Sequence, residues 1–360
     1  MRYLQFGLTE HNHTKATPGF TLFSPLFQRK TYIINMSGEV VHEWELPGPP
    51  GDYAYILPNG NLFAATWLGG GPNGFFAKGG RLQEIDWHGK VVWEYHDEFQ
   101  HHDFRRLKNG NTVYLGWKLL PNEAAACIKG GQPGSEHKDG IWGDYVREID
   151  STGETVWEWH CHEHMKLDNY PLQPETNRQE FAHANTIAPL TDGNFLICFR
   201  LIDLIAVINR QSGKITWERF ECDWGGPHDL QELDNGNMMV FANRGLHAGP
   251  RGSSVIEFDR HTGKTLWEYK GNPTHTFDSP FISGCQRLES GNTLICEGQW
   301  GRLFEVTLEG DVVWEYVSPY SVNVSRAADE AAVEGDVNFI FRAYRYQADG
   351  PEIRSRLGKP

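Results

Sequence analysis

The sequence has few cysteines, and none of them lie close together. Six cysteines occur in 360 residues, and the two nearest, Cys285 and Cys296, are 11 positions apart (296 − 285). No Cys-x-x-Cys pair exists, which excludes a thioredoxin-like redox motif and a zinc ribbon. Long apolar runs are also missing, because the most apolar stretch, residues 195–208, contains Arg200 and Asp203. A membrane-spanning helix needs roughly 20 apolar residues, so we expect reduced thiols and no membrane span.

Positive charge is also scarce. Lys and Arg together number 33 against 47 Asp and Glu, which gives a net charge of −14. Such a chain repels nucleic-acid phosphates and anionic membrane surfaces, so we expect neither as a partner. The first residues, MRYLQFGLTEHNHT, lack the apolar core and the small-residue cleavage site of a secretory signal. We therefore expect a cytoplasmic protein, or a periplasmic one if the sequence is a mature form.

Aromatic residues and glycine are abundant and recur at regular intervals. The chain contains 13 Trp and 39 Gly. A segment of the form strand–turn–strand that ends in Trp-Glu occurs six times, for example as LQEIDWHGKVVWEY and LFEVTLEGDVVWEY. Its tryptophans are Trp44, Trp93, Trp157, Trp217, Trp267 and Trp314, and its turn glycines are Gly38, Gly89, Gly153, Gly213, Gly263 and Gly310. We expect the tryptophans to pack between neighbouring units and the glycines to form turns.

A second recurring segment, of the form LPNGNLF or LDNGNMM, lies between the Trp-Glu segments. It occurs five times, and its glycines are Gly60, Gly110, Gly193, Gly236 and Gly291. Asn-Gly and Asp-Gly between alternating apolar runs indicate tight β-hairpins, because both turn residues can adopt positive φ. Two hairpins in each repeat make four antiparallel strands, which is the pattern of one blade of a β-propeller.

The number of hairpins predicts how the ring closes. The Trp-Glu hairpin at 31–45 has no strand pair before it, and the β-rich tail at 337–346 has none after it. Pairing the tail with the N-terminal hairpin closes the ring and removes two exposed sheet edges. We therefore predict an all-β fold and one domain over residues 1–360: a six-bladed β-propeller of four-stranded antiparallel blades. The blades are expected at about 46–96, 97–160, 177–220, 222–270, 276–317, and 333–347 together with 20–45, and helix is expected only as a short turn within 325–335.

Three histidines occupy matching places in neighbouring blades. In an up-and-down blade the innermost strand lines the central channel and begins at the face that carries the long loops. His102 and His228 each precede the glycine of their hairpin by eight residues (110 − 102 and 236 − 228), and His183 precedes its glycine by ten (193 − 183). Arg200, at the end of the second strand of blade three, returns to the same face. The corresponding regions of blades one and five offer Asp52, Tyr53, Ser283 and Cys285.

Imidazoles and a guanidinium at one opening form a binding site for an anion. One imidazole can act as nucleophile or general acid and base, and Arg offers a planar donor fork that suits sulfate, phosphate or carboxylate. We therefore expect a small aromatic or anionic substrate at His102, His183, His228 and Arg200. Further candidates nearby are His101, Tyr53, Asn243 and Arg244. Aromatic residues of the mouth loops that could stack on a substrate are Trp67, Phe75, Phe76, Trp117, Trp142 and Trp224.

A metal site is the weaker interpretation of a second histidine cluster. The run WEWHCHEH contains His160, His162 and His164, but alternation along an outer strand would place these side chains on different faces. A divalent metal therefore remains an alternative, and otherwise no cofactor is expected. The GxSxG, HExxH and P-loop motifs are all absent from the sequence.

The motifs HHDFRRLKNGN, FAHAN, GPHDLQELDNGN and GNTLICEGQWGRLFEV resemble those of bacterial arylsulfotransferases. These are the enzymes that use an aryl sulfate and not the nucleotide donor PAPS, and the likeness runs from about Pro18 to Tyr346. The resemblance implies a six-bladed propeller that moves a sulfuryl group between phenols through a sulfohistidine. It also implies that His228 is the nucleophile and that His102, His183 and Arg200 hold the sulfuryl oxygens, with Asn185 beside them.

Two other functions stay open at this point. A propeller lyase or hydrolase could act on an anionic, carboxylated or sulfated substrate, with the histidines as acid and base or as ligands of a divalent metal. A non-catalytic propeller could present its loops to a binding partner. The oligomeric state is not indicated by the sequence.

Overall fold

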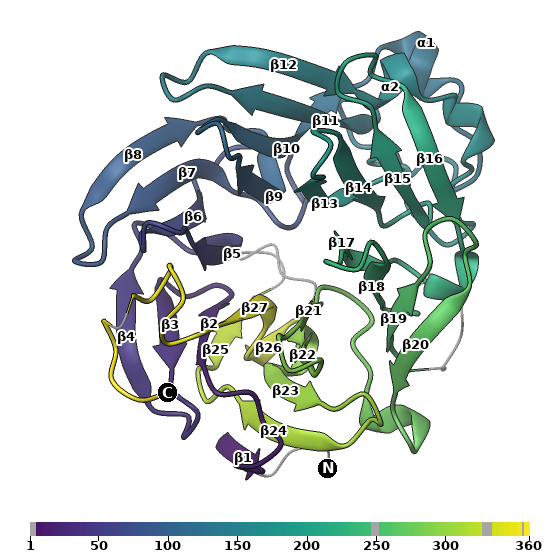
Figure 1. Ribbon diagram of the computed structural model, residues 1–360. Helices are drawn as coiled ribbons and strands as arrows, with labels where there is room; N and C mark the ends of the chain where they lie inside the picture. Colours follow the sequence, from purple (N-terminus) through teal and green to yellow (C-terminus); the bar gives the residue numbers. More distant parts are fainter. Residues whose placement is uncertain (1–4, 246–251, 326–332, 355) are drawn as a thin grey trace.

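The strands form six four-stranded antiparallel sheets arranged in a ring, so the fold is the predicted six-bladed β-propeller (Figure 1). This computed structural model describes residues 5–245, 252–325, 333–354 and 356–360. Blade one contains β5 (Pro50–Ile56), β6 (Leu62–Trp67), β7 (Gly80–Ile85) and β8 (Val91–His96). Blade two contains β9 (Gln100–Arg106), β10 (Thr112–Leu119), β11 (Trp142–Ile149) and β12 (Thr155–His160). Blade three contains β13 (Ala184–Pro189), β14 (Phe195–Phe199), β15 (Leu204–Ile208) and β16 (Ile215–Phe220).

The remaining blades complete the ring. Blade four contains β17 (His228–Glu232), β18 (Met238–Ala242), β19 (Ser254–Phe258) and β20 (Thr265–Lys270). Blade five contains β21 (Gly284–Arg287), β22 (Thr293–Glu297), β23 (Arg302–Val306) and β24 (Val312–Val317). The first strand of each blade is innermost, and the inner strands contact one another in a closed circle around the axis (Figure 1).

Blade six joins the two ends of the chain, as predicted. Its inner strand is β27 (Ile340–Tyr346), and its other strands are β2 (Phe20–Pro25), β3 (Lys30–Ile34) and β4 (Val40–Glu45). β27 pairs antiparallel with β2, so that Phe20 lies opposite Tyr346. The C-terminal tail therefore supplies one strand and the N-terminal segment supplies three.

Some elements were not predicted. β1 (Gly7–His11) adds a fifth strand to the outer edge of blade five by pairing with β24. β25 (Val322–Val324) and β26 (Gly335–Val337) form a separate hairpin. The short helical turn predicted within 325–335 falls mostly on residues 326–332, which lie outside the described residues. The helical segments in the described part are α1 (Asn122–Ala125), α2 (Cys161–His164), η1 (Leu167–Asn169), η2 (Cys222–Trp224), η3 (Thr274–Thr276) and η4 (Gly298–Trp300).

The repeated tryptophans connect each blade to the next. In every blade an outer-strand indole donates a hydrogen bond to a turn carbonyl of the following blade: Trp44 to Asp86, Trp93 to Ser151, Trp159 to Gly213, Trp217 to Arg260, Trp267 to Leu308 and Trp314 to Met36. In blade two the donor is Trp159, whereas Trp157, two residues earlier on β12, packs against Phe195 of blade three as expected. The apolar part of each indole adds to the packing between blades, so the repeat specifies the ring.

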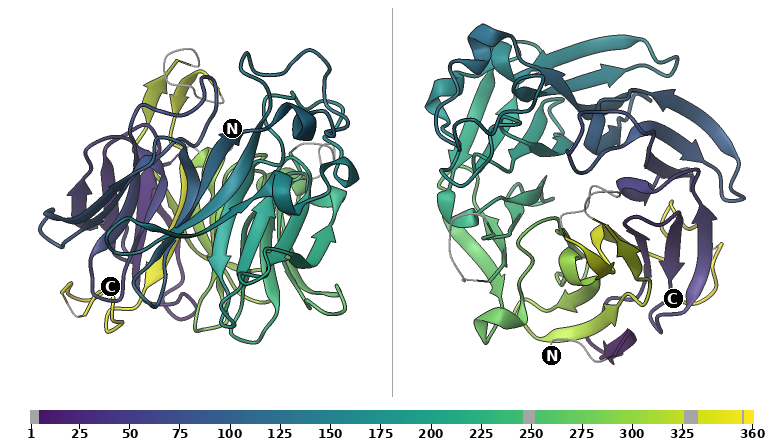
Figure 2. Two further views of the ribbon diagram at one scale, coloured as in Figure 1. Left: turned by 90° about the horizontal axis from the view of Figure 1, so that it is seen from above. Right: turned by 180° about the vertical axis from the view of Figure 1, so that it is seen from behind.

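The long loops gather on one face of the ring. In the side view the β25–β26 hairpin and the loop between β10 and β11 rise from the same end (Figure 2). This is the face at which the inner strands begin. Among the described residues, the helical segments are too short to cross a lipid bilayer.

Candidate active site

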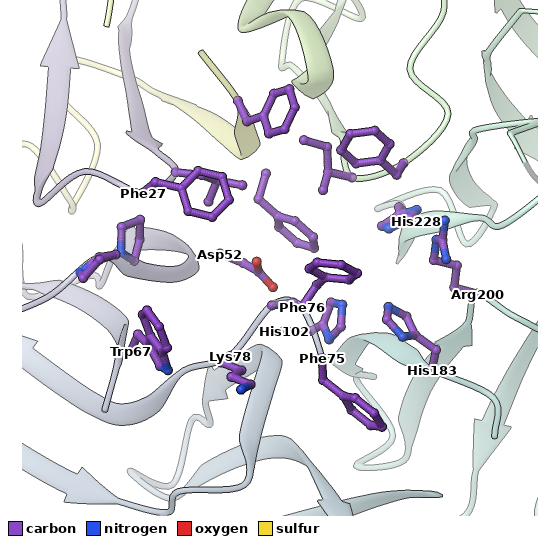
Figure 3. A pocket seen from close by; sticks show the side chains of 18 residues that line it. Phe27, Asp52, Trp67, Phe75, Phe76, Lys78, His102, His183, Arg200 and His228 are labelled. Carbon is purple, nitrogen blue, oxygen red and sulfur yellow. The ribbon is translucent and has the colours of Figure 1, made fainter. Parts of the chain in front are cut away.

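A cavity of about 250 Å³ opens at the mouth of the central channel on the loop face. His102, His183, Arg200 and His228 all line it, so the four residues that the spacing singled out lie together (Figure 3). The other walls are largely aromatic and include Phe27, Trp67, Phe75, Phe76, Phe281, Phe339 and Phe341. The cavity therefore combines a cationic and imidazole-rich end with apolar walls that suit an aromatic ring.

An irregularity at the start of the inner strands turns the site residues toward the axis. The pairing of the inner strand with the second strand slips in blades one to four, next to Asp52, His102, His183 and His228. The φ angle is +85° at Asp52, +48° at His102 and +56° at His183, and it is +51° at Asp229, just after His228. Such bulges re-aim side chains beside active sites, and here they direct them into the cavity.

His228 is held in one tautomer. Its Nδ1 atom lies 2.7 Å from Oδ1 of Asn243 and 3.0 Å from the carbonyl oxygen of Gly226. Both partners are acceptors, so Nδ1 carries the proton and the lone pair of Nε2 remains for the cavity. Burial, aided by the nearby Arg200 guanidinium, holds the pKa of His228 well below 6.5, which keeps the imidazole neutral and nucleophilic.

His183 is oriented by a carboxylate that the sequence analysis missed. Nδ1 of His183 lies 2.5 Å from Oε1 of Glu180, and the indole of Trp117 donates to Oε2 of the same carboxylate at 3.1 Å. Burial opposes ionisation of Glu180, but His183 beside it keeps the pKa of the carboxyl below its usual value. The ionised Glu180 therefore fixes the ring of His183 with Nε2 available to the cavity.

His102 is supported by a second imidazole. Nδ1 of His102 lies 2.8 Å from Nδ1 of His101, whose ring stacks on Trp117 and whose Nε2 lies 3.4 Å from Asp144. Burial first, and then the nearby His183, hold the pKa of His102 well below 6.5. The candidate His101 therefore lies behind the cavity wall as a positioning group.

Arg200 supplies a fixed positive charge at the histidine end of the cavity, and Lys78 also lines the wall. Its backbone N–H donates to the carbonyl of His183 at 3.0 Å, which places both residues at the same end. Burial lowers the pKa of its guanidinium, while Glu180 and Asp203 nearby oppose that effect. Because a guanidinium stays protonated in proteins and forks toward oxyanions, this end of the cavity favours a bound anion.

The remaining sequence candidates lie outside the cavity wall. Asn185 is fully buried, and its Nδ2 donates to the carbonyl of Pro227 at 2.8 Å, directly before His228. Tyr53 is also fully buried and hydrogen bonds to Asp103. Arg244 points to Glu268, with 3.0 Å between Nη2 and Oε1. Asn185 and Asn243 thus position the His228 segment, whereas Tyr53 and Arg244 have structural partners.

Two other groups of residues are separated by the fold. Trp67, Phe75 and Phe76 line the cavity, but Trp117, Trp142 and Trp224 do not belong to its wall. His160, which ends β12, and His162 on α2 keep their rings in contact, with 5.6 Å between the centroids, whereas the ring of His164 stacks parallel to Trp159. Within the described ranges, no three His, Cys, Asp or Glu side chains are grouped to hold a metal ion.

Of the two residues that the sequence offered in blade one, Asp52 lines the cavity and Tyr53 does not. Asp52 lines the cavity and is 5% exposed. A signal for it exists in the sequence, since Asp52 precedes Gly60 by eight residues (60 − 52), the spacing of His102 and His228. Glu180 has no comparable signal, because it lies in a loop between blades.

Comparisons with known proteins give the family of this chain and agree with its fold. The sequence model of the family described as "Arylsulfotransferase (ASST)" matches residues 54–319, which cover all the cavity-lining histidines and Arg200. Among solved structures, a protein of unknown function from Bacteroides caccae has a TM-score of 0.57 at 15% identity and covers 91% of this chain and 99% of its own. Virginiamycin B lyase from Staphylococcus aureus has a TM-score of 0.45 at 14% identity, covering 90% and 91%. No curated protein sequence matches the chain.

Proposed function

Because the chain belongs to the arylsulfotransferase (ASST) family, we propose that it transfers a sulfuryl group from an aryl sulfate to a phenol through a sulfohistidine at His228. The observation that carries this proposal is the fixed tautomer of His228, which presents a neutral Nε2 at the same end of the cavity as Arg200. A neutral nucleophile next to an anion-binding group is what attack on a sulfate ester requires.

In the first half-reaction, the Nε2 lone pair of His228 attacks sulfur. An N–S bond forms, the bond from sulfur to the aryl oxygen breaks, and the phenolate leaves with that electron pair. Arg200 and His102 stabilise the sulfuryl oxygens, on which charge accumulates in the transition state. In the reacting state His183 carries a proton on each ring nitrogen, with Nδ1–H held by the ionised Glu180 at 2.5 Å, and it donates the Nε2 proton to the leaving phenolate and becomes neutral.

The second half-reaction reverses these steps with a new phenol. Its hydroxyl oxygen attacks the sulfur, His183 takes up the hydroxyl proton, and the N–S electron pair returns to Nε2 of His228. The site then regains its starting protonation, and the net reaction exchanges one phenol for another. The aromatic walls around Phe76 and Phe341 bind the ring in both steps.

The test is an assay of sulfuryl transfer from 4-nitrophenyl sulfate to phenol, in which the absorbance of the released nitrophenolate is measured. We expect His228→Ala to lose at least about 1,000-fold in kcat/KM, because the covalent route is removed. The matched control is His261→Ala, which removes an exposed histidine from a turn on the opposite face.

The intermediate is tested separately by mass spectrometry. Incubation with donor alone should add one sulfuryl group to the peptide that contains His228, and this adduct should disappear when phenol is added. Absence of transfer and hydrolysis across a panel of aryl sulfates, or full activity in His228→Ala, would refute the proposal.

A further inference from the structure

The cavity has a second polar end, opposite His228. Asp52 is the third residue of β5 in blade one and His228 is the first residue of β17 in blade four, and three blades separate opposite sides of a six-bladed ring. In the close-up view, Asp52 faces His228 and Arg200 across the cavity, with Phe76 between them (Figure 3). A ligand whose reacting group lies at His228 therefore extends toward Asp52.

One oxygen of the Asp52 carboxyl group is buried without a hydrogen-bond partner in the part of the chain that the structure describes. Asp52 is 5% exposed, and within the described residues its Oδ2 atom has no hydrogen-bond partner. Burial raises its pKa well above the usual value, and the distant Arg342 charge opposes this only in part. Buried polar groups nearly always have hydrogen-bond partners. An unpartnered carboxyl oxygen on a residue that lines a cavity therefore indicates that a ligand supplies the missing donor.

The backbone also holds Asp52 in an uncommon conformation. Its φ angle is +85°, a region that costs a non-glycine residue free energy and is typical of functional sites. The neighbouring Gly51 fixes this arrangement, because a Cβ atom there would lie 2.6 Å from Cα of Gly79. The loop before β7 therefore packs directly against the segment that presents Asp52.

The cavity as a whole has room for one substituted ring beside Phe76. The cavity volume of about 250 Å³ and the walls of Phe27, Phe76 and Phe341 suit a single aromatic ring. When the reacting oxygen lies at His228, a substituent on the far side of the ring points toward blade one.

We propose that Asp52 is a specificity-determining residue that accepts a hydrogen bond from a hydroxyl or ammonium group on the substrate ring, remote from the reacting oxygen. The inference rests on the proposed function and narrows its substrates to phenols that carry a second hydrogen-bond donor. Examples of the two donor types are 1,4-dihydroxybenzene and 4-(2-aminoethyl)phenol.

Equilibrium binding tests the proposal without requiring turnover. Calorimetry would compare two isosteric pairs, namely 1,4-dihydroxybenzene with 4-methylphenol and 4-(2-aminoethyl)phenol with 4-propylphenol. The proteins are the wild type, Asp52→Ala, Asp52→Asn and the control Asp349→Ala, which removes an exposed carboxylate. Thermal unfolding would verify that each variant is folded.

In each pair, the Kd ratio is the Kd of the donor-bearing ligand divided by the Kd of its isostere. We expect Asp52→Ala to raise this ratio about tenfold or more in at least one pair. Asp349→Ala should leave both ratios unchanged. Asp52→Asn keeps an oxygen acceptor and should therefore affect the hydroxyl pair less than the ammonium pair. The pair that responds identifies the donor type.

Equal weakening of all four ligands, or unchanged ratios, would overturn the proposal, since a merely structural carboxyl acts on every ligand alike. Transfer assays with 4-nitrophenyl sulfate should show the same discrimination in kcat/KM for the acceptor. If the Kd ratios shift but no phenol is sulfated, the proposed function fails while ligand recognition by Asp52 stands.

Discussion

At the scale of single residues, the site uses one nitrogen of each imidazole for structure and the other for chemistry. Nδ1 of His228 contacts amide oxygens, Nδ1 of His183 contacts a carboxylate, and Nδ1 of His102 contacts another imidazole. These partners differ in charge, so the three rings are not interchangeable. A neutral acceptor suits a nucleophile that must lose and regain its lone pair, whereas the carboxylate of Glu180 suits proton transfer.

The role of Asn243 is testable because it contacts His228 but not the cavity. In Asn243→Ala the imidazole keeps only the Gly226 carbonyl, at 3.0 Å, so its orientation is less restricted. We expect kcat/KM for 4-nitrophenyl sulfate to fall about 10- to 100-fold. The hydrogen bond that His228 donates to Asn243 raises the pKa of His228, so its loss should also move the acid limb of the pH–kcat/KM profile to lower pH.

The control for this prediction is Asn235→Ala, which removes an exposed turn asparagine from the same blade. Stability must be measured in parallel, because Asn243 also donates to the carbonyls of Ser279 and Ile282 at 2.7 Å. A variant that loses stability but retains both the wild-type kcat/KM and the wild-type pH profile would contradict the positioning role.

At the scale of elements, the hairpin repeats could be predicted from the sequence, but the bulges could not. The Asn-Gly turns and the Trp-Glu strands are local signals, since each depends on residues adjacent in the chain. The eight-residue spacing before the turn glycine located His102 and His228, and it applies equally to Asp52. A bulge depends on pairing with the next strand, so the sequence alone does not show that Asp52 and not Tyr53 faces the cavity.

The residues missed by the sequence analysis lie mainly in irregular segments. Glu180 lies in the loop before β13, and Asp203 lies in the turn between β14 and β15. Oδ1 of Asp203 accepts a hydrogen bond at 2.7 Å from the backbone of Gly226, in the segment that leads to His228. Such contacts between loops of different blades carry no periodic signal, so only the folded chain identifies them.

Asp203 makes the free energy of unfolding depend on pH. Burial raises its pKa to about 7, from the usual 3.8, although the hydrogen bond from the Gly226 backbone and the charge of Arg200 oppose this shift. Between pH 4 and 7 the folded chain keeps a proton that the unfolded chain has released, so the free energy of unfolding decreases as the pH rises through this window. The maximum cost is roughly 4 kcal/mol, since one pKa unit corresponds to about 1.4 kcal/mol.

Asp203→Asn should therefore gain stability relative to the wild type as the pH increases from about 4.5 to 8. Urea denaturation at several pH values measures the difference in the free energy of unfolding between the variant and the wild type. The titratable groups that both proteins share contribute equally to each and cancel in this difference. Parallel stability curves over this range would show that Asp203 does not titrate in this way.

At the scale of the whole molecule, the strand that closes the ring also ties the inner strands together. Arg342 on β27 is 1% exposed and lies 3.0 Å from Asp103 on β9 and 3.0 Å from Asp229 on β17. It also donates to Oγ1 of Thr186 on β13 at 2.9 Å. One side chain of blade six thus contacts blades two, three and four. The ring closure could be predicted by counting hairpins, but the contacts of Arg342 with Thr186 and Asp103 span 156 and 239 positions of sequence and leave no local pattern.

The last prediction concerns this arginine. In Arg342→Met, Asp103 and Asp229 stay buried without their shared cation, although Arg105 remains 3.3 Å from Asp103. Because removing one partner leaves an uncompensated buried charge, we expect the free energy of unfolding to fall by about 3 kcal/mol at pH 7. The loss should shrink at pH 4.5, where both carboxyls take up protons more readily in the variant. The control is Arg29→Met, whose exposed ion pair with Glu45 spans 3.7 Å and should contribute little. Equal stability of the two variants at pH 7 would show that the closing strand is held by its backbone pairing with β2 and not by charge.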